Sequence, residues 1–153
     1  MEVSSIERVV EDLAVMNSKL LLLIGAPDSG KSNLLGELAK RRQLKILNVG
    51  AALGQELLTI ASPRRNIDAI DLLKSLSDEF SQNDLLLMDN LEILFDQELK
   101  LSPLDILKRH SQARCVVAIW PGELKDKRLT YAKIGHPEFR EYSCDGVVPF
   151  RLN

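Results

Sequence analysis

The sequence predicts an α/β domain with a mostly parallel sheet, and three observations support this prediction. Short continuous apolar runs such as KLLLLI (19–24) and LLLM (85–88) have the pattern of strands that are buried on both faces. Helical segments of ten or more residues separate these runs, which is the alternation that parallel strands require. A length of 153 residues, with 45% hydrophobic and 27% charged residues, suits one globular domain.

The first half of the chain is expected to begin with an amphipathic helix, because Val3, Ile6, Val10 and Leu13 recur at helical spacing. A glycine-rich turn follows the first apolar run, and Pro63 suits the first turn of a later helix. The expected elements are a helix at 3–17, a strand at 19–24, a helix from the glycine-rich turn to about 42, a strand at 44–49, and helices at 51–60 and 63–82.

The second half is expected to add strands at 85–89 and 114–120, with two helical pieces between them that are broken before Pro103. Two further strands flank Asp145-Gly146, a dipeptide that suits a tight hairpin turn. Pro149 would confine the second of these strands to a sheet edge. The single predicted domain therefore comprises an opening helix (1–18), a core (19–120), and a C-terminal loop and hairpin or edge strands (121–153).

The octapeptide GAPDSGKS (25–32) satisfies the pattern G-x-x-x-x-G-K-[ST], which is the Walker A motif or P-loop. Its glycines let the backbone N–H groups turn inward toward a β-phosphate, and the helix that follows adds its positive end. We expect Lys31 to bridge the β- and γ-phosphates and the Ser32 hydroxyl to coordinate Mg²⁺. The predicted nucleotide-contact residues are Gly25, Ala26, Pro27, Asp28, Ser29, Gly30, Lys31, Ser32 and Asn33.

An acidic residue at the end of another buried strand would complete such a site. LLLMDN (85–90) supplies it, because Asp89 follows four apolar residues, as a Walker B aspartate does when it orients magnesium-bound water. The predicted cofactors are ATP and Mg²⁺, and the predicted metal-site residues are Ser32 and Asp89.

These motifs resemble those of P-loop ATPases of the AAA+ branch, in which GPPGTGKT corresponds to GAPDSGKS. The chain also resembles the BrxF family, small P-loop proteins of type 3 bacteriophage-exclusion (BREX) defence systems, in its length, in LLLMDNLEILF and in the tail LTYAKIGHPEFREY. The resemblance implies a three-layer P-loop NTPase core. It also implies a slow ATPase or nucleotide-gated switch in a multi-protein anti-phage assembly in the cytoplasm.

The chain departs from a full AAA+ ATPase at the positions that serve catalysis. Asn90 stands where many members have a glutamate, and an amide cannot accept the proton of the attacking water. Glu92 is the nearest substitute, or else a solvated residue at the start of a helix. Trp120 stands where many members have a polar residue that senses the γ-phosphate, so it is either a weak sensor or a core residue. Asp28 replaces a glycine and tolerates the backbone angles of the loop.

Residues 121–153 are too few for the helical lid of an AAA+ protein, so we expect none and infer that a neighbouring protein covers the nucleotide. The resemblance implies an arginine supplied across a subunit boundary. Arg128 is the first candidate and Arg140 the second, with surface solubility as the alternative for each. We therefore expect nucleotide-dependent self-association or a hetero-complex with other defence proteins.

Bulk composition excludes several classes of function. A net charge of −2 gives no general attraction to nucleic acid, so DNA contact is expected only through partners or a local patch. The apolar runs are too short to cross a bilayer, and the acidic N-terminus is unlike a signal peptide. Two cysteines without metal-site spacing, Cys115 and Cys144, indicate a reduced, cytoplasmic protein. A non-hydrolysing scaffold with a structural nucleotide and a small nucleotide or metabolite kinase stay open as alternatives.

Overall fold

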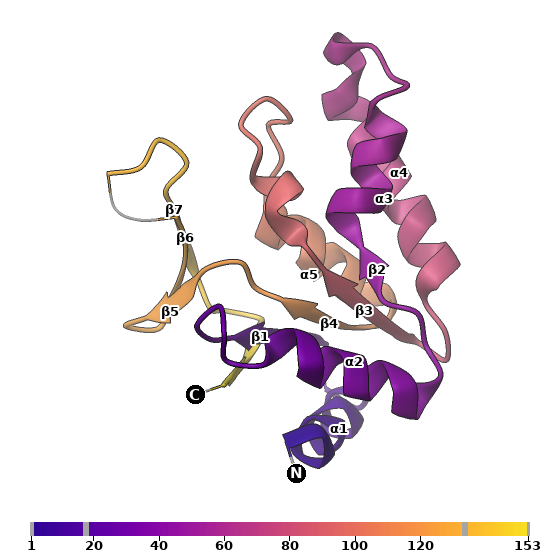
Figure 1. Cartoon of the computed structure of the whole chain (residues 1–153), viewed down its shortest axis with the longest axis vertical. Coiled ribbons are helices and arrows are strands. Elements are labelled where there is room, and N and C mark those ends of the chain that lie inside the picture. The colour runs from indigo at the N-terminus through magenta and orange to yellow at the C-terminus, as the bar shows by residue number, and fades with distance from the viewer. Residues whose placement is uncertain (1, 17–18, 133–134, 153) are drawn as a thin grey trace.

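The computed structural model describes residues 2–16, 19–132 and 135–152. It confirms the α/β class and the mostly parallel sheet (Figure 1). The helical elements are α1 (Glu2–Leu13), α2 (Lys31–Arg42), α3 (Val49–Leu57), α4 (Ser62–Phe80), the 3₁₀ helix η1 (Leu91–Phe95) and α5 (Pro103–Ala113). The strands are β1 (Leu20–Ile24), β2 (Leu47–Asn48), β3 (Leu85–Asp89), β4 (Cys115–Ile119), β5 (Glu123–Lys125), β6 (Arg128–Tyr131), β7 (Arg140–Ser143) and β8 (Val148–Arg151).

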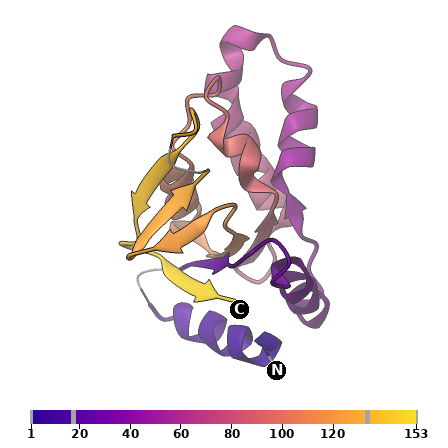
Figure 2. The same cartoon turned by 60° about the vertical axis from the view of Figure 1, so that its left-hand side comes forward.

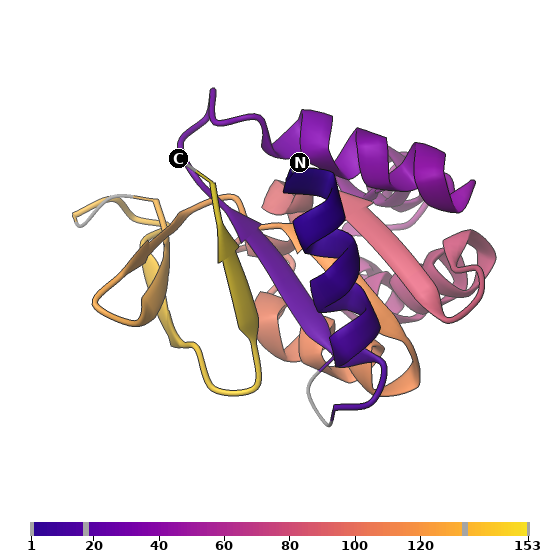
Figure 3. The ribbon, with the colours of Figure 1, turned by 90° about the horizontal axis from the view of Figure 1, so that it is seen from below.

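The main sheet has the strand order β2-β3-β4-β1-β8, and every neighbouring pair is parallel. Side chains of β1 alternate between two hydrophobic cores, because successive residues of a strand point to opposite faces. Leu21 and Leu23 pack with α1 and α2, whereas Leu20, Leu22 and Ile24 pack with α3, α4, η1 and α5. Helices therefore cover both faces of the sheet in three layers (Figures 1 and 3).

The opening helix buries the face that its periodicity predicted. Val3, Ile6, Val10 and Leu13 of α1 are all less than 10% exposed. The helix ends at Leu13, earlier than the expected residue 17, and residues 17 and 18 lie outside the described part of the chain.

The second strand is shorter than expected at both ends, and a helix cap accounts for its early C-terminal end. The sequence predicted a strand at 44–49, but β2 contains only Leu47 and Asn48. The Asn48 side chain accepts a hydrogen bond from the Ala51 N–H at 3.0 Å, which is the geometry of a helix N-cap. Helix α3 therefore begins at Val49.

The predicted C-terminal hairpin is wrong, although both of its strands exist. Strand β7 pairs with β6 in a small antiparallel sheet of order β5-β6-β7, whereas β8 pairs in parallel with β1. The Asp145-Gly146 segment thus connects two sheets. Strand β8 lies at the edge of the main sheet, so the edge position expected from Pro149 is confirmed.

The small antiparallel sheet is anchored to the end of β4 and to η1 (Figure 2). The Trp120 indole N–H donates a hydrogen bond to the Thr130 carbonyl at 3.0 Å, and the Trp120 side chain is fully buried. Phe95 of η1 stacks on Tyr131 of β6, with ring centroids 3.9 Å apart. Gly122 allows this close approach, since a Cβ there would overlap the Thr130 carbonyl.

The described part of residues 121–152 contains strands and connecting segments and no helix. Among the described residues, none of the helices combines the length and the apolar character needed to pass through a bilayer.

Candidate functional site

The carboxyl ends of the parallel strands form one edge of the main sheet, where ligands of open α/β sheets generally bind. The preferred place is a switch point, at which the connections from two adjacent strands leave in opposite directions. The connection from β1 leads to β2 at one side of the sheet, and the connection from the adjacent β4 leads to β8 at the other. The segment that follows β1 therefore lies at the switch point.

That segment is the glycine-rich loop, residues 25–30, which joins β1 to α2. The loop turns at its centre, where the Ser29 N–H donates to the Ala26 carbonyl at 3.0 Å. Gly30 then takes the left-handed conformation at φ 95° and precedes α2 without a side-chain cap. The first N–H groups of a helix have no acceptor within the helix, so those of Lys31, Ser32 and Asn33 remain available at the sheet edge.

Gly25 admits no side chain, because the loop packs closely against strand β8. A Cβ at residue 25 would lie 2.5 Å from Ser29 Oγ and 2.9 Å from the Leu152 carbonyl oxygen. The Leu152 N–H also donates to the Ile24 carbonyl at 2.8 Å, immediately before the loop. Strand β8 thus fixes the start of the loop.

Lys31 reaches back across the loop and donates from Nζ to the Gly25 carbonyl at 2.5 Å. Ala26, Pro27, Asp28, Ser32 and Asn33 are exposed, whereas Gly25, Ser29, Gly30 and Lys31 are partly buried. The structure therefore places the predicted contact residues on one continuous segment whose centre faces solvent.

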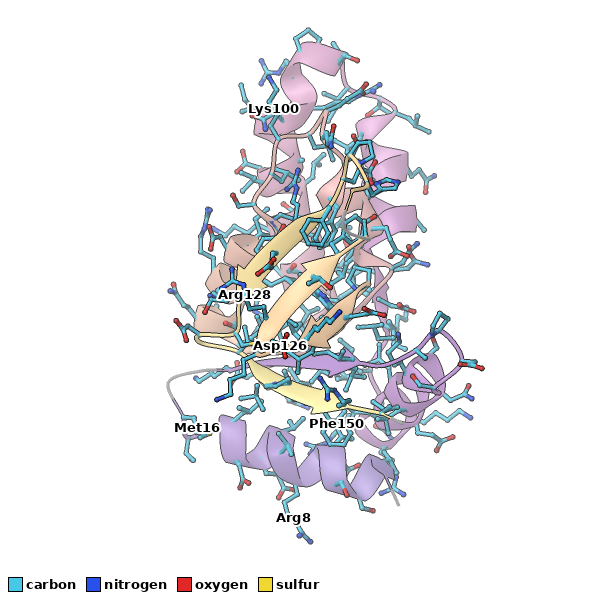
Figure 4. The ribbon with its side chains drawn as sticks, turned by 90° about the vertical axis from the view of Figure 1, so that its left-hand side faces the viewer. Arg8, Met16, Lys100, Asp126, Arg128 and Phe150 are labelled. Carbon is cyan, nitrogen blue, oxygen red and sulfur yellow. The ribbon has the colours of Figure 1, made fainter. Side chains whose placement is uncertain are left out.

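A cleft of about 1300 Å³ lies between the glycine-rich loop and the small sheet. Gly25, Pro27 and Lys31 line it on one side. Residues of η1, β5, β6, β7 and β8 line the other side, and their charged members are Glu92, Glu123, Lys125, Arg128, Glu141 and Arg151. Figure 4 shows Arg128 on the small sheet and Asp126 in the turn before β6.

Asp89 ends β3 at the same edge of the sheet as the loop, as its sequence position predicted. Met88 and Leu22 both lie beside Ala118, so Asp89 lies one level further along and two strands away from β1, roughly 10 Å across the sheet. Its Oδ1 accepts the Asn90 N–H at 2.6 Å. No group of three or more histidine, cysteine or acidic side chains suited to a metal occurs among the described residues.

Asn90 joins the end of β3 to the beginning of α3. It adopts φ 57°, and its Nδ2 donates to Asn48 Oδ1 at 2.9 Å. Its carbonyl accepts the Gly50 N–H at 3.0 Å. The Asn90 amide therefore has a structural partner. Glu92 is exposed on η1 and lines the cleft.

The two arginines expected to act across a subunit boundary both have partners within the chain. Arg128 forms an ion pair with Glu141 of the neighbouring strand, and both side chains are about half exposed. Arg140 donates from Nη1 to the Leu101 carbonyl at 3.2 Å. Trp120 is a core residue whose single N–H is bonded to Thr130, which confirms the structural interpretation of that residue.

Sequence reasoning missed Arg151. The register of β8 places Arg151 directly beside Ile24, the residue before the loop, and its side chain lines the cleft. Its Nη2 donates to the Leu124 carbonyl at 2.7 Å. A local pattern around residues 147–152 indicates a strand but not its partner, so the sequence contains no signal that would have brought Arg151 to the loop.

The cysteines offer no obvious reactive site in this structure. Cys115 is buried in β4, and burial raises the pKa of its thiol to about 11, so the thiol stays protonated near pH 7. Cys144 is free and partly buried, and burial raises its pKa as well. Both cysteines are free thiols in this structure, and the reducing compartment stays a prediction.

Comparison of the chain with protein-family models and with the sequences of curated proteins gave no match. Function is therefore inferred from the loop, the cleft and the residues around them.

Proposed function

We propose that this chain binds ATP and Mg²⁺ at the glycine-rich loop and the first turn of α2. The observation that supports this most is the backbone of the loop. Gly25 admits no Cβ, Gly30 adopts φ 95°, and the uncapped N-terminus of α2 faces the edge of a parallel sheet. A helix N-terminus of this kind favours phosphate, because its free N–H groups and its dipole both attract negative charge. Together with the GKS sequence, this geometry favours a P-loop.

The side chains near the loop suit a nucleotide and its metal ion. Lys31 is expected to exchange the Gly25 carbonyl for the β- and γ-phosphate oxygens. Magnesium is commonly held by one or two protein oxygens together with phosphate oxygens and water. The Ser32 hydroxyl and the Asp89 carboxylate supply oxygen ligands of that kind. A bound Mg²⁺ would neutralise charge on the phosphates.

Slow hydrolysis is the activity that these residues favour. The Asn90 amide is bonded to Asn48 and has no site that accepts a proton from water. Glu92 is one of the exposed carboxylates that line the cleft beside the loop. The same observation also favours a second candidate, a scaffold whose nucleotide is purely structural.

We further propose that the protein acts as a nucleotide-gated switch in a BREX-like anti-phage assembly, in the cytoplasm, through self-association or binding to other defence proteins. Arg128 is half exposed, so it would reach a neighbouring molecule by leaving Glu141. DNA contact, if it occurs, is assigned to partners or a local patch.

Lys31→Ala tests the nucleotide site directly. Titration of a fluorescent ATP analogue should show about 10- to 100-fold weaker binding, the size expected for one charge-assisted hydrogen bond. Lys40→Ala is the matched control, since Lys40 is an exposed lysine near the other end of α2. Equal affinities of wild type and Lys31→Ala would refute the site. Phosphate release by wild type then separates the ATPase from the scaffold, which releases none.

A further inference from the structure

We propose that Arg151 contacts the phosphate chain of a nucleotide held by the loop of the same molecule. This inference rests on the proposed nucleotide site and adds to it an arginine that acts in cis. The sequence indicated an arginine from a neighbouring subunit, whereas the fold places one beside the loop of its own chain.

The position of Arg151 follows from the pairing of β8 with β1. Residues 148–151 pair with residues 21–24, so the backbone of Arg151 lies beside Ile24. The next residue, Leu152, donates its N–H to Ile24 and lies against Gly25. Backbone hydrogen bonds hold the β8 residues before Arg151 and also Leu152 after it. The backbone of Arg151 therefore has a fixed place next to the start of the glycine-rich loop.

Arg151 is not paired with a carboxylate among the described residues. A guanidinium has five N–H donors in a planar fork, and one Nη2–H of Arg151 is bonded to the Leu124 carbonyl. Arg128, by contrast, is paired with Glu141. Arg151 is therefore the cleft arginine that is ready to receive an anion.

The geometry of the guanidinium suits phosphate. Arginine binds phosphate oxygens with two parallel hydrogen bonds, and such charge-assisted bonds are about twice as strong as neutral ones. The bond to the Leu124 carbonyl holds one edge of the group and leaves other donors for the cleft. The same side chain then joins the small sheet, through β5, to the phosphates at the loop.

The experiment compares Arg151→Gln with wild type, using ATP and inorganic tripolyphosphate as separate ligands in calorimetric titrations. We expect Arg151→Gln to bind both ligands about tenfold more weakly or worse, the effect of one lost charge-assisted hydrogen bond. Arg151→Lys keeps the charge and should recover part of this loss. Arg8→Gln removes the same charge from the outer face of α1 (Figure 4) and should bind both ligands within about twofold of wild type.

Arg151→Gln could weaken binding only because the small sheet shifts, and Trp120→Phe tests that explanation. This substitution removes the Trp120–Thr130 hydrogen bond, which is another anchor of the small sheet, without removing a charge from the cleft. Tripolyphosphate affinity should stay within about twofold of wild type. A loss as large as that of Arg151→Gln would mean that Arg151 only positions the sheet, and would overturn the proposal.

Other outcomes separate this proposal from the nucleotide site itself. Weaker binding of ATP but unchanged binding of tripolyphosphate by Arg151→Gln would assign Arg151 to the nucleoside and overturn the phosphate contact. If Lys31→Ala loses ATP binding and Arg151→Gln does not, the nucleotide site stands and the cis arginine fails. If Lys31→Ala binds ATP as wild type does, the site itself fails.

Discussion

Replacing Gly25 with alanine tests how tightly the glycine-rich loop packs against β8. The added Cβ would lie 2.5 Å from Ser29 Oγ and 2.9 Å from the Leu152 carbonyl oxygen. The hydroxyl can rotate away, but the Leu152 carbonyl belongs to a backbone whose N–H is bonded to Ile24. Overpacking of this kind costs about 1–3 kcal/mol in unfolding free energy. For a domain of this size, the melting temperature should fall by about 2–12 °C.

Urea unfolding followed by far-ultraviolet circular dichroism measures this change, with Gly36→Ala as the matched control. Gly36 lies within α2, and a Cβ there would meet no atom within 4 Å. Alanine is favoured over glycine inside a helix by about 0.5–1 kcal/mol, so Gly36→Ala should raise the stability. Glycine-to-alanine substitution is thus expected to lower the unfolding free energy in the loop and to raise it in the helix that follows.

A second substitution identifies which contact of the added Cβ causes the loss of stability. Ser29→Ala should be close to neutral, because the Ser29 hydroxyl is buried without a hydrogen-bond partner. Combined with Gly25→Ala it removes the 2.5 Å contact and leaves the contact with Leu152. The double variant should therefore recover only part of the loss. A Gly25→Ala protein as stable as wild type would refute the packing of the loop on β8.

Three further predictions concern the residues around the site and one partly buried histidine, His110. Asn90→Asp should lower the unfolding free energy by about 1–3 kcal/mol, because a carboxylate would face the Asn48 oxygen in place of a donor. Asn83→Asp, at another exposed left-handed position, should change the unfolding free energy little in the same urea experiment. Wild-type ATP turnover, measured by phosphate release, should stay well below about 10 per second, and faster turnover would mean that a catalytic base has been missed. Burial lowers the pKa of His110 from its ordinary value of 6.5, so the unfolded chain takes up a proton more readily than the folded one. The contribution of neutral His110 to the unfolding free energy should therefore be fully present above about pH 6.5 and be lost as the pH falls through the lower, folded-state pKa. His110→Gln should flatten the plot of unfolding free energy against pH in this range.

The buried strands and the loop could be predicted from sequence because their signals are local. The apolar runs at 19–24, 85–89 and 114–120 correspond to β1, β3 and β4 within one residue at each end. The helix after the glycine-rich turn ends at Arg42, as expected. In each case a continuous apolar run or a helical period contains the information within the segment itself.

The C-terminal sheet could not be predicted because strand pairing is not local. Asp145-Gly146 is a good turn sequence, yet the strands on either side of it pair with β6 and β1. A tight hairpin forms instead between β5 and β6, and it turns at Asp126 and Lys127, which adopt φ 52° and 63°. Hairpin turns of this type favour asparagine and glycine, so the segment gave no turn signal.

The candidate site also divides into residues predicted from local sequence and contacts that depend on distant parts of the chain. Lys31 and Ser32 were predicted from the motif and Asp89 from its position after a buried apolar run, and the fold places all three at one edge of the sheet. The bonds of Asn90 to Asn48 and of Arg151 to Leu124 depend on elements that are distant in sequence. Local patterns therefore predicted the loop residues and Asp89, whereas the contacts of Asn90 and Arg151 became visible only in the fold.

The central position of β1 has a consequence for how the protein folds. Residues 20–23 pair with 116–119 on one side, and residues 21–24 pair with 148–151 on the other, so β1 has no partner nearby in sequence. Closing such long loops costs conformational entropy before the favourable contacts form, and proteins rich in distant contacts therefore fold slowly. Helix α2 can form early from local interactions, whereas the backbone of Gly25 reaches its final shape only when residues 148–152 have docked. Native loop geometry is therefore expected among the last events of folding.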